Sequence, residues 1–170
     1  MTDVTDDDLA VVAEQLGRPA RGVVGVAARC VCGRPTVVRT APRLPDGTPF
    51  PTTFYLTHPV AVAVVSTLEA GGLMREMNER LASDPELAAA HRRAHEDYLA
   101  RRAELGDDVV EIAGISAGGM PDRVKCLHAL AGHALAAGPG VNPIGDRAVE
   151  EMGEWWASGP CAQPAPGDGA

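Results

Sequence analysis

Residues 22–40 read GVVGVAARCVCGRPTVVRT, and this stretch decides the fold class. Its first part, Gly22 to Arg29, is rich in valine and predicts a β-strand, and Thr36 to Thr40 predicts a second one. The sequence Cys32-Gly33-Arg34-Pro35 between them is typical of a turn, so we expect an antiparallel hairpin. Residues 52–57 are rich in aromatic and branched side chains and predict a third strand. The N-terminal third of the chain therefore builds a small antiparallel sheet.

A stiff loop leads into the third strand. Residues 42–51 contain four prolines in ten residues, with Asp46-Gly47 at their centre. Proline holds φ near one value, and Asp-Gly favours a tight turn. We expect this loop to be rigid and to act as a brace that aims His58 at a site. The alternative is a packing turn with no link to function.

The remainder of the chain is predicted to be mainly helical. Helices are expected over residues 6–16, 60–70, 73–82, 86–105, 121–137 and 148–156, from apolar spacing and from capping residues. The sequence Ser83-Asp84-Pro85-Glu86 is a strong N-cap signal for the longest of them. Asn142 to Asp146 is expected to form a tight turn. The predicted fold is α+β, a single domain over residues 1–150 with a small antiparallel sheet packed against four or five helices. Residues 157–170, rich in Pro, Gly and Ala, are expected to be a disordered tail that includes Cys161.

Composition narrows the classes of function. The chain has 170 residues, 45% hydrophobic but only 4% aromatic, and a formal net charge of -8. This charge argues against general binding of nucleic acid or anionic membranes, which need basic patches. Neither a signal peptide nor a transmembrane segment is found, so we expect a cytoplasmic protein without membrane insertion. Cysteines stay reduced there, which favours metal or thiol chemistry over a disulfide.

Soft metal ligands come from three separate places in the chain. The candidates are Cys30, Cys32, His58, Cys126, His128 and His133. Thiolate and imidazole suit zinc and also iron. Spacing alone is not decisive, because on a regular helix Cys126 and His128 would point about 200° apart and His133 would lie about 10 Å along the axis from Cys126. The alternative is that the cysteines are small buried apolar residues.

Two further functions are open around the same segment. Arg123 and Lys125 are expected in the first turns of a helix preceded by Gly118-Gly119, where a phosphate-containing anion could bind. The alternative for this pair is a solvated helix face. Cys126 could also be a nucleophile with His128 or His133 as its base.

Four aromatic or imidazole side chains receive simpler interpretations. His91 and His95 lie one turn apart on the long charged helix and are expected to face solvent. Their spacing lacks the metalloprotease pattern. Trp155 and Trp156 are expected to dock the last helix onto the body, with a partner surface as the alternative.

Several longer strings resemble one known family. They are RC at 29–30, PRLPDGTPFPT at 42–52, YLTHP at 55–59, RVKCLH at 123–128 and NP at 142–143. This pattern, over about residues 8–146, resembles a bacterial conserved domain family of unknown function, common in actinobacteria. The resemblance implies a short cytoplasmic protein with no established activity. It also implies that the genes tend to neighbour those for a septum-formation initiator and an exopolyphosphatase.

The same resemblance bears on the metal ligands. In the family the position of His58 is either Cys or His, an exchange that suits a zinc ligand better than a packing position. The resemblance therefore favours Cys30, His58 and Cys126 as ligands, with His128 or His133 as the fourth.

The sequence thus predicts a small protein that binds metal, zinc or else iron, through Cys and His ligands. One alternative is a non-enzymatic accessory factor that binds a protein partner in cell division or envelope control. Another is a thiol- or metal-dependent hydrolase that processes a phosphate-containing ligand.

Overall fold

The computed structural model describes residues 2–106 and 109–157. The predicted hairpin and third strand are present as β1 (Val23–Arg29), β2 (Pro35–Thr40) and β3 (Phe54–Leu56). They form one antiparallel sheet in the order β1-β2-β3. In the register, Val37 of β2 lies opposite both Ala28 and Leu56. The α+β prediction is confirmed.

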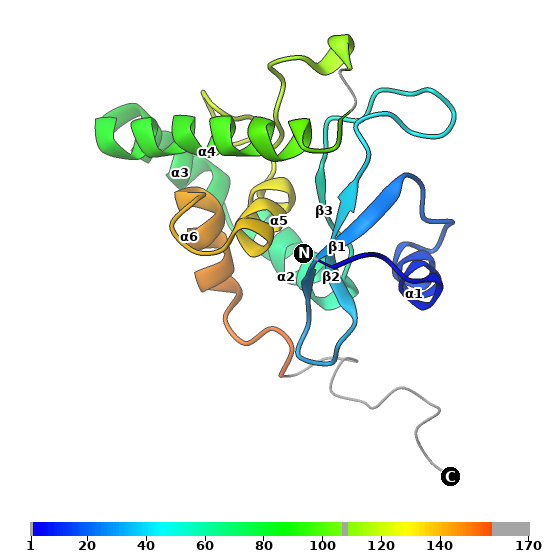
Figure 1. The fold of residues 1–170 in the computed structure, drawn as a ribbon. Helices are drawn as coiled ribbons and strands as arrows, with labels where there is room; N and C mark the ends of the chain where they lie inside the picture. The colour runs from blue at the N-terminus through cyan, green and yellow to red at the C-terminus, as the bar shows by residue number, and fades with distance from the viewer. Residues whose placement is uncertain (1, 107–108, 158–170) are drawn as a thin grey trace.

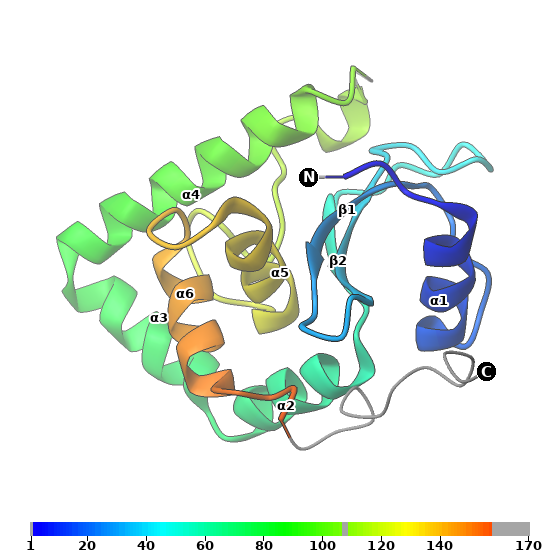
Figure 2. The same cartoon turned by 60° about the horizontal axis from the view of Figure 1, so that its bottom comes forward.

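Six α-helices accompany the sheet in the described part of the chain. They are α1 (Asp6–Leu16), α2 (Pro59–Ala70), α3 (Leu73–Ser83), α4 (Pro85–Ala103), α5 (Leu127–Ala137) and α6 (Pro143–Met152), with a short 3-10 turn at Val110–Ile112. Figures 1 and 2 show α1 on one face of the sheet and α5 on the other, with α2, α3, α4 and α6 around α5. Helix α5 is therefore the centre of the molecule.

The composition of α5 explains why it can occupy this place. Its sequence LHALAGHALAA is small and apolar, and seven consecutive or near-consecutive residues from Leu127 to Ala134 are buried. A Cβ at Gly132 would lie 3.0 Å from the carbonyl oxygen of Phe54 in β3. A Cβ at Gly145 of α6 would overlap the carbonyl oxygen of Leu130. Glycine at both positions lets the backbones of sheet, α5 and α6 approach closely.

The predicted cap of α4 is present, whereas the predicted start of α5 is wrong. Asp84 Oδ1 accepts from the amides of Glu86 and Leu87, both at 3.0 Å, and Pro85 is the first helical residue. Helix α5, however, begins at Leu127 and not at residue 121. Asn78 of α3 pairs with both backbone groups of Val124 at 2.8 Å each, and these bonds replace the helical ones.

Two other expectations need correction. The segment Asn142 to Asp146 is not a separate turn, because Asn142 caps α6 by accepting from the Gly145 amide at 2.9 Å. His91 and His95 do not face solvent: His91 is 0% exposed, and His95 Nδ1 lies 2.8 Å from Ser116 Oγ. Tertiary contacts with the 113–125 segment override the charged pattern of α4.

The remaining expectations fall on the loop, the chain end and membranes. Gly47 has a φ of +86°, as expected for the turn in the proline-rich loop. The predicted tail, 157–170, lies outside the described residues except for Ala157. Over the described ranges, none of the helices combines the length and the apolar character needed to cross a membrane.

Candidate functional site

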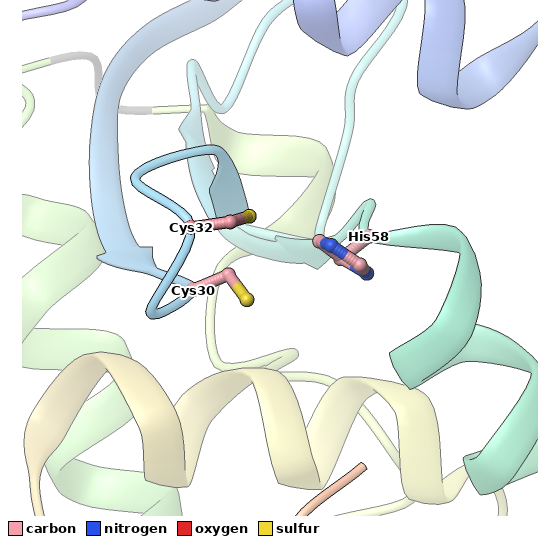
Figure 3. A group of neighbouring side chains, drawn as sticks. All are labelled: Cys30, Cys32 and His58. Atoms are coloured by element: carbon pink, nitrogen blue, oxygen red, sulfur yellow. The ribbon is translucent and has the colours of Figure 1, made fainter. Parts of the chain in front are cut away.

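The hairpin turn and the start of α2 bring two thiols and one imidazole together. The ligand atoms of Cys30, Cys32 and His58 all lie within 4.8 Å of one another. Cys30 directly follows β1, Cys32 lies in the turn, and His58 is the residue before α2. Figure 3 shows the two side chains of the turn on the side where His58 lies. We call these three residues the hairpin site.

Backbone hydrogen bonds hold the turn in this shape. The amide of Cys30 donates to the carbonyl of Arg34 at 2.9 Å, and the amide of Gly33 donates to the carbonyl of Cys30 at 2.9 Å. Gly33 has a φ of +83°, in the left-handed region that favours glycine. The reversal after Cys32 therefore depends on Gly33, and it places both thiols at one end of the sheet.

His58 is buried with one ring nitrogen unsatisfied. Its side chain is 3% exposed, and Nδ1 is without a hydrogen-bond partner among the described residues. The Trp155 ring packs edge-on against the imidazole at 4.9 Å between centroids. Burial, and next the charge of Arg34, lower the pKa of His58 below its usual value. The ring is therefore neutral at pH 7, which is the form that binds metal.

A second group of titratable side chains forms where the end of α2 meets the start of α5. The ligand atoms of Glu69, Cys126 and His128 also lie within 4.8 Å of one another. Cys126 is the extended N-cap residue of α5, with φ -152° and ψ 113°, and His128 lies in the first turn. Glu69 Oε1 accepts from the Leu127 amide at 2.7 Å, so α2 supplies the cap of α5. We call Glu69, Cys126 and His128 the α5 group.

Hydrogen bonds assign the protonation of His128. Ser66 Oγ lies 2.9 Å from the Val62 carbonyl and donates to it, so its oxygen is left to accept. Nε2 of His128 lies 3.2 Å from both this hydroxyl and the Val62 carbonyl. Nδ1 lies 3.2 Å from Glu69 Oε1. Both ring nitrogens thus face acceptors, and only the doubly protonated imidazolium satisfies both.

The pKa values agree with this assignment. Hydrogen bonding to Cys126, together with the nearby Glu69 carboxylate, raises the pKa of His128 to about 9. The hydrogen bond from His128 is the largest cause that lowers the pKa of the Cys126 thiol, followed among the lowering causes by the Ala129 amide. The arrangement favours a thiolate beside an imidazolium at the N-terminus of a helix.

A cavity of about 590 Å³ adjoins the α5 group. Cys126 and His128 line it together with residues from the end of α1, from β3 and from the start of α2. The lining is mainly apolar and includes Leu16, Phe54 and Val62. Such a volume and lining are typical of a pocket for a small ligand.

The structure divides the expected ligand set between two places. Cys30 and His58 meet as expected, with Cys32 as the third member, and Cys126 meets His128. Cys126 does not join Cys30 and His58 in one group whose ligand atoms lie within 4.8 Å. Among the described residues, Cys126 therefore belongs to a different group from Cys30 and His58.

His133 lies in neither group. It is 0% exposed, with Nε2 at 2.8 Å from Asp97 Oδ2 and Nδ1 at 3.2 Å from Asn142 Nδ2. It also stacks on the Phe54 ring at 5.4 Å. Both ring nitrogens are occupied, so the surroundings of His133 suit a buried structural histidine.

Arg123 and Lys125 precede α5 and do not stand in its first turns. Both side chains are exposed, and neither is among the residues that line the cavity. The helix start on which the predicted anion site was based is therefore wrong. Anion binding by these two residues stays a prediction without support from this geometry.

Glu69 was missed by sequence reasoning, although a signal for it exists. In α2 the residues Val62, Ser66 and Glu69 recur at helical spacing, and Ser66 and Glu69 are polar positions in an otherwise mainly apolar helix. That face now contacts His128. The pattern could not predict that His128 is the partner of this face, because His128 lies about sixty residues further along the chain.

Of three comparisons with known proteins, only the comparison with family models gives a match. No match was found among curated proteins or among solved structures. A family model described as "Protein of unknown function (DUF501)" matches residues 26–150. That range contains the hairpin site, the α5 group and every strand and helix except α1, the first part of β1 and the end of α6. On this match, the chain belongs to the DUF501 family of proteins of unknown function.

Proposed function

We propose that this protein binds zinc through Cys30, Cys32 and His58. The observation that carries the proposal is the buried ring of His58, which has no hydrogen-bond partner at Nδ1 and a ring nitrogen within 4.8 Å of two thiols. A buried polar atom without a partner is costly, and a bound metal would satisfy it. Two thiolates and a neutral imidazole are a ligand set that zinc prefers.

The hairpin site suits metal better than the α5 group does. In the α5 group both nitrogens of His128 already face acceptors, and Glu69 Oε1 already accepts two contacts. A metal there would have to replace these hydrogen bonds. At the hairpin site a metal would add a bond where none is described for Nδ1 of His58.

Zinc at the hairpin site would join segments that are distant in sequence. It would tie the turn after β1 to the junction of β3 and α2, next to Trp155 at the end of the described helices. Binding to the folded state alone stabilises it by mass action. Three protein ligands leave the fourth position of a tetrahedral zinc for water or another ligand.

The test is elemental analysis of untagged protein together with the Cys32→Ser variant. Cys32 is exposed whereas Cys30 is 6% exposed in the core, so only the Cys32 change leaves the packing intact. We expect about one zinc per wild-type chain and none after Cys32→Ser. The melting temperature should fall in the variant and in chelator-treated wild type to the same degree.

Cys126→Ser is the matched control, because it makes the same chemical change in the other group. It should retain the metal. Loss of metal in Cys126→Ser but not in Cys32→Ser would move the site to the α5 group and overturn the proposal. Iron in place of zinc would correct the identity of the metal only.

A further inference from the structure

The α5 group offers a chemistry that is independent of the hairpin site. Three features coincide there: a thiol at the N-terminus of a helix, an imidazole with acceptors at both nitrogens, and a carboxylate that positions the imidazole. Each feature alone is common. Together they form the arrangement of an activated cysteine, with a nucleophilic thiol, a base and a group that orients the base. The cavity of about 590 Å³ opens beside the thiol.

We propose that Cys126 is a nucleophile that accepts an uncharged, apolar acyl group from an ester or thioester bound in this cavity. His128 is the proton donor and acceptor of the reaction. Glu69 is a positioning residue that acts through His128.

The lining of the cavity selects the class of substrate. Among the described residues that line it, none is Lys or Arg, and His128 is already paired with Glu69. A phosphoryl or carboxylate group would therefore lack a cation to bind it. Apolar side chains such as Leu16, Leu56 and Val62 suit a hydrocarbon chain, and Gln15 and Thr57 offer a few polar atoms.

The acyl-transfer step balances without a further reagent. The Cys126 thiolate attacks the carbonyl carbon, the new C–S bond forms, and the C–O or C–S bond to the leaving group breaks. The leaving group takes a proton from His128 and departs as an alcohol or thiol. Water then gives a proton to His128 and attacks the acyl-enzyme, which releases the acid and restores the thiolate.

The charged groups around the Cys126 sulfur suit both the acylation step and the hydrolysis of the acyl-enzyme. The charged groups that act on Cys126 are His128 from α5 and Glu69 from α2. The hydrogen bond to Cys126 is the largest cause of the raised pKa of His128. Acylation removes the thiolate from this bond, so the pKa of His128 falls and the imidazole becomes able to accept the proton of water.

The first test uses p-nitrophenyl butyrate with the full-length protein. We expect a burst of p-nitrophenolate, an acyl adduct that peptide mass spectrometry assigns to Cys126, and no burst after Cys126→Ser. His128→Gln should slow adduct formation by roughly 100-fold or more, the scale of general acid–base catalysis. Ser83→Ala, an exposed change outside both groups, should leave the burst unchanged. Chelator-treated wild type should still form the adduct on Cys126, which separates this proposal from the zinc proposal.

The second test is the pH dependence of alkylation by iodoacetamide, read at Cys126 by mass spectrometry. A small reference thiol with a pKa of about 8.5 should lose roughly 80-fold in rate between pH 8 and pH 6. Cys126 should lose much less, and the His128→Gln variant should move towards the reference profile. This readout would not respond to a purely structural role of His128.

Several outcomes would overturn the proposal. These are an unmodified, folded protein after exposure to the ester, an adduct on another cysteine, an equal rate in His128→Gln, or a Cys126 profile that parallels the reference thiol. Hydrolysis of p-nitrophenyl phosphate instead of the ester would reject the acyl class. Loss of bound metal in Cys126→Ser would reassign the group as a metal site.

Discussion

At the residue scale, the surroundings of two histidines in this chain shift their pKa values in opposite directions. His58 is buried, and burial lowers its pKa. His128 faces acceptors at both nitrogens, and the neighbouring thiol and carboxylate raise its pKa to about 9. The same type of side chain is therefore neutral in one group and a cation in the other, because the surroundings decide which form costs less.

The first prediction concerns the titration of His128. By NMR its ring should titrate near pH 9, well above the ordinary value of 6.5. Because folding raises the pKa of His128, protonated His128 stabilises the folded state. This stabilisation is fully present below pH 6.5 and is lost as pH rises through about 9. The difference in unfolding free energy between wild type and His128→Gln should shrink over that window. Glu69→Gln should lower the titration midpoint, and an unchanged midpoint would contradict the role given to Glu69.

At the element scale, close backbone contacts place α5. Gly132 lies against β3 and Gly145 of α6 lies against the Leu130 carbonyl, so the backbone of α5 approaches the sheet and α6 closely at these two points. Asn78 of α3 pairs with both backbone groups of Val124, and this pairing contributes to the start of α5 at Leu127. These contacts place Cys126 at the N-cap, from which its thiol can meet His128.

The second prediction is that Gly145→Ala destabilises the fold. The added methyl group would overlap the Leu130 carbonyl, and neither backbone can yield without separating α5 from α6. We expect a loss of about 1–3 kcal/mol in chemical denaturation, the usual cost of overpacking. Gly25→Ala is the matched control, because a Cβ there would meet its nearest atom at 3.4 Å. Equal effects of the two changes would show that the close contact is unimportant.

The third prediction is that Asn78→Ala loosens the segment before α5. Both backbone groups of Val124 lose a partner, and we expect a cost of about 2 kcal/mol. The thiol of Cys126 should also become less reactive towards iodoacetamide at pH 6, because the bonds of Asn78 to Val124 hold the segment that leads into the N-cap. Ser83→Ala, at an exposed position, serves as the control. Stability is measured by urea unfolding. If Asn78→Ala is destabilised but Cys126 keeps its normal reactivity, the bonds of Asn78 to Val124 do not position the thiol.

At the scale of the whole molecule, the segment that follows α6 meets the hairpin site. Trp155, which follows α6, packs on His58 at 4.9 Å and is 7% exposed, so the expected docking of the last helix is confirmed. The segment after α6 therefore packs on His58, one of the three residues of a site that begins in the N-terminal hairpin. A metal bound at His58 should therefore change the fluorescence of Trp155.

The fourth prediction uses that contact. Addition of Co²⁺ to the metal-free protein should quench tryptophan emission in proportion to the metal bound, because an open-shell ion at His58 would lie close to the Trp155 ring. Trp155→Phe should lose most of this response while still binding metal, and Cys32→Ser should lose both. Quenching that persists in Cys32→Ser would place the metal elsewhere.

A fifth prediction tests whether the proline-rich loop, residues 42–51, acts as a brace that aims His58. If it does, Asp46→Ala with Gly47→Ala should weaken metal affinity by more than the loss of global stability explains. Unchanged metal affinity with a lower melting temperature would show that the loop is only structural.

The sequence by itself determined the elements of this protein. The valine-rich hairpin, the Asp84-Pro85 start of α4 and the turn at Gly47 follow from propensities and caps that act over a few residues, so they could be predicted. It also indicated which residue types carry the chemistry. Only the tertiary structure decided how they are grouped, because Cys30 meets His58 and Cys126 meets Glu69 across long stretches of chain. It also decided where α5 begins and which histidine is charged, since hydrogen bonds from distant elements and burial outweigh local pattern.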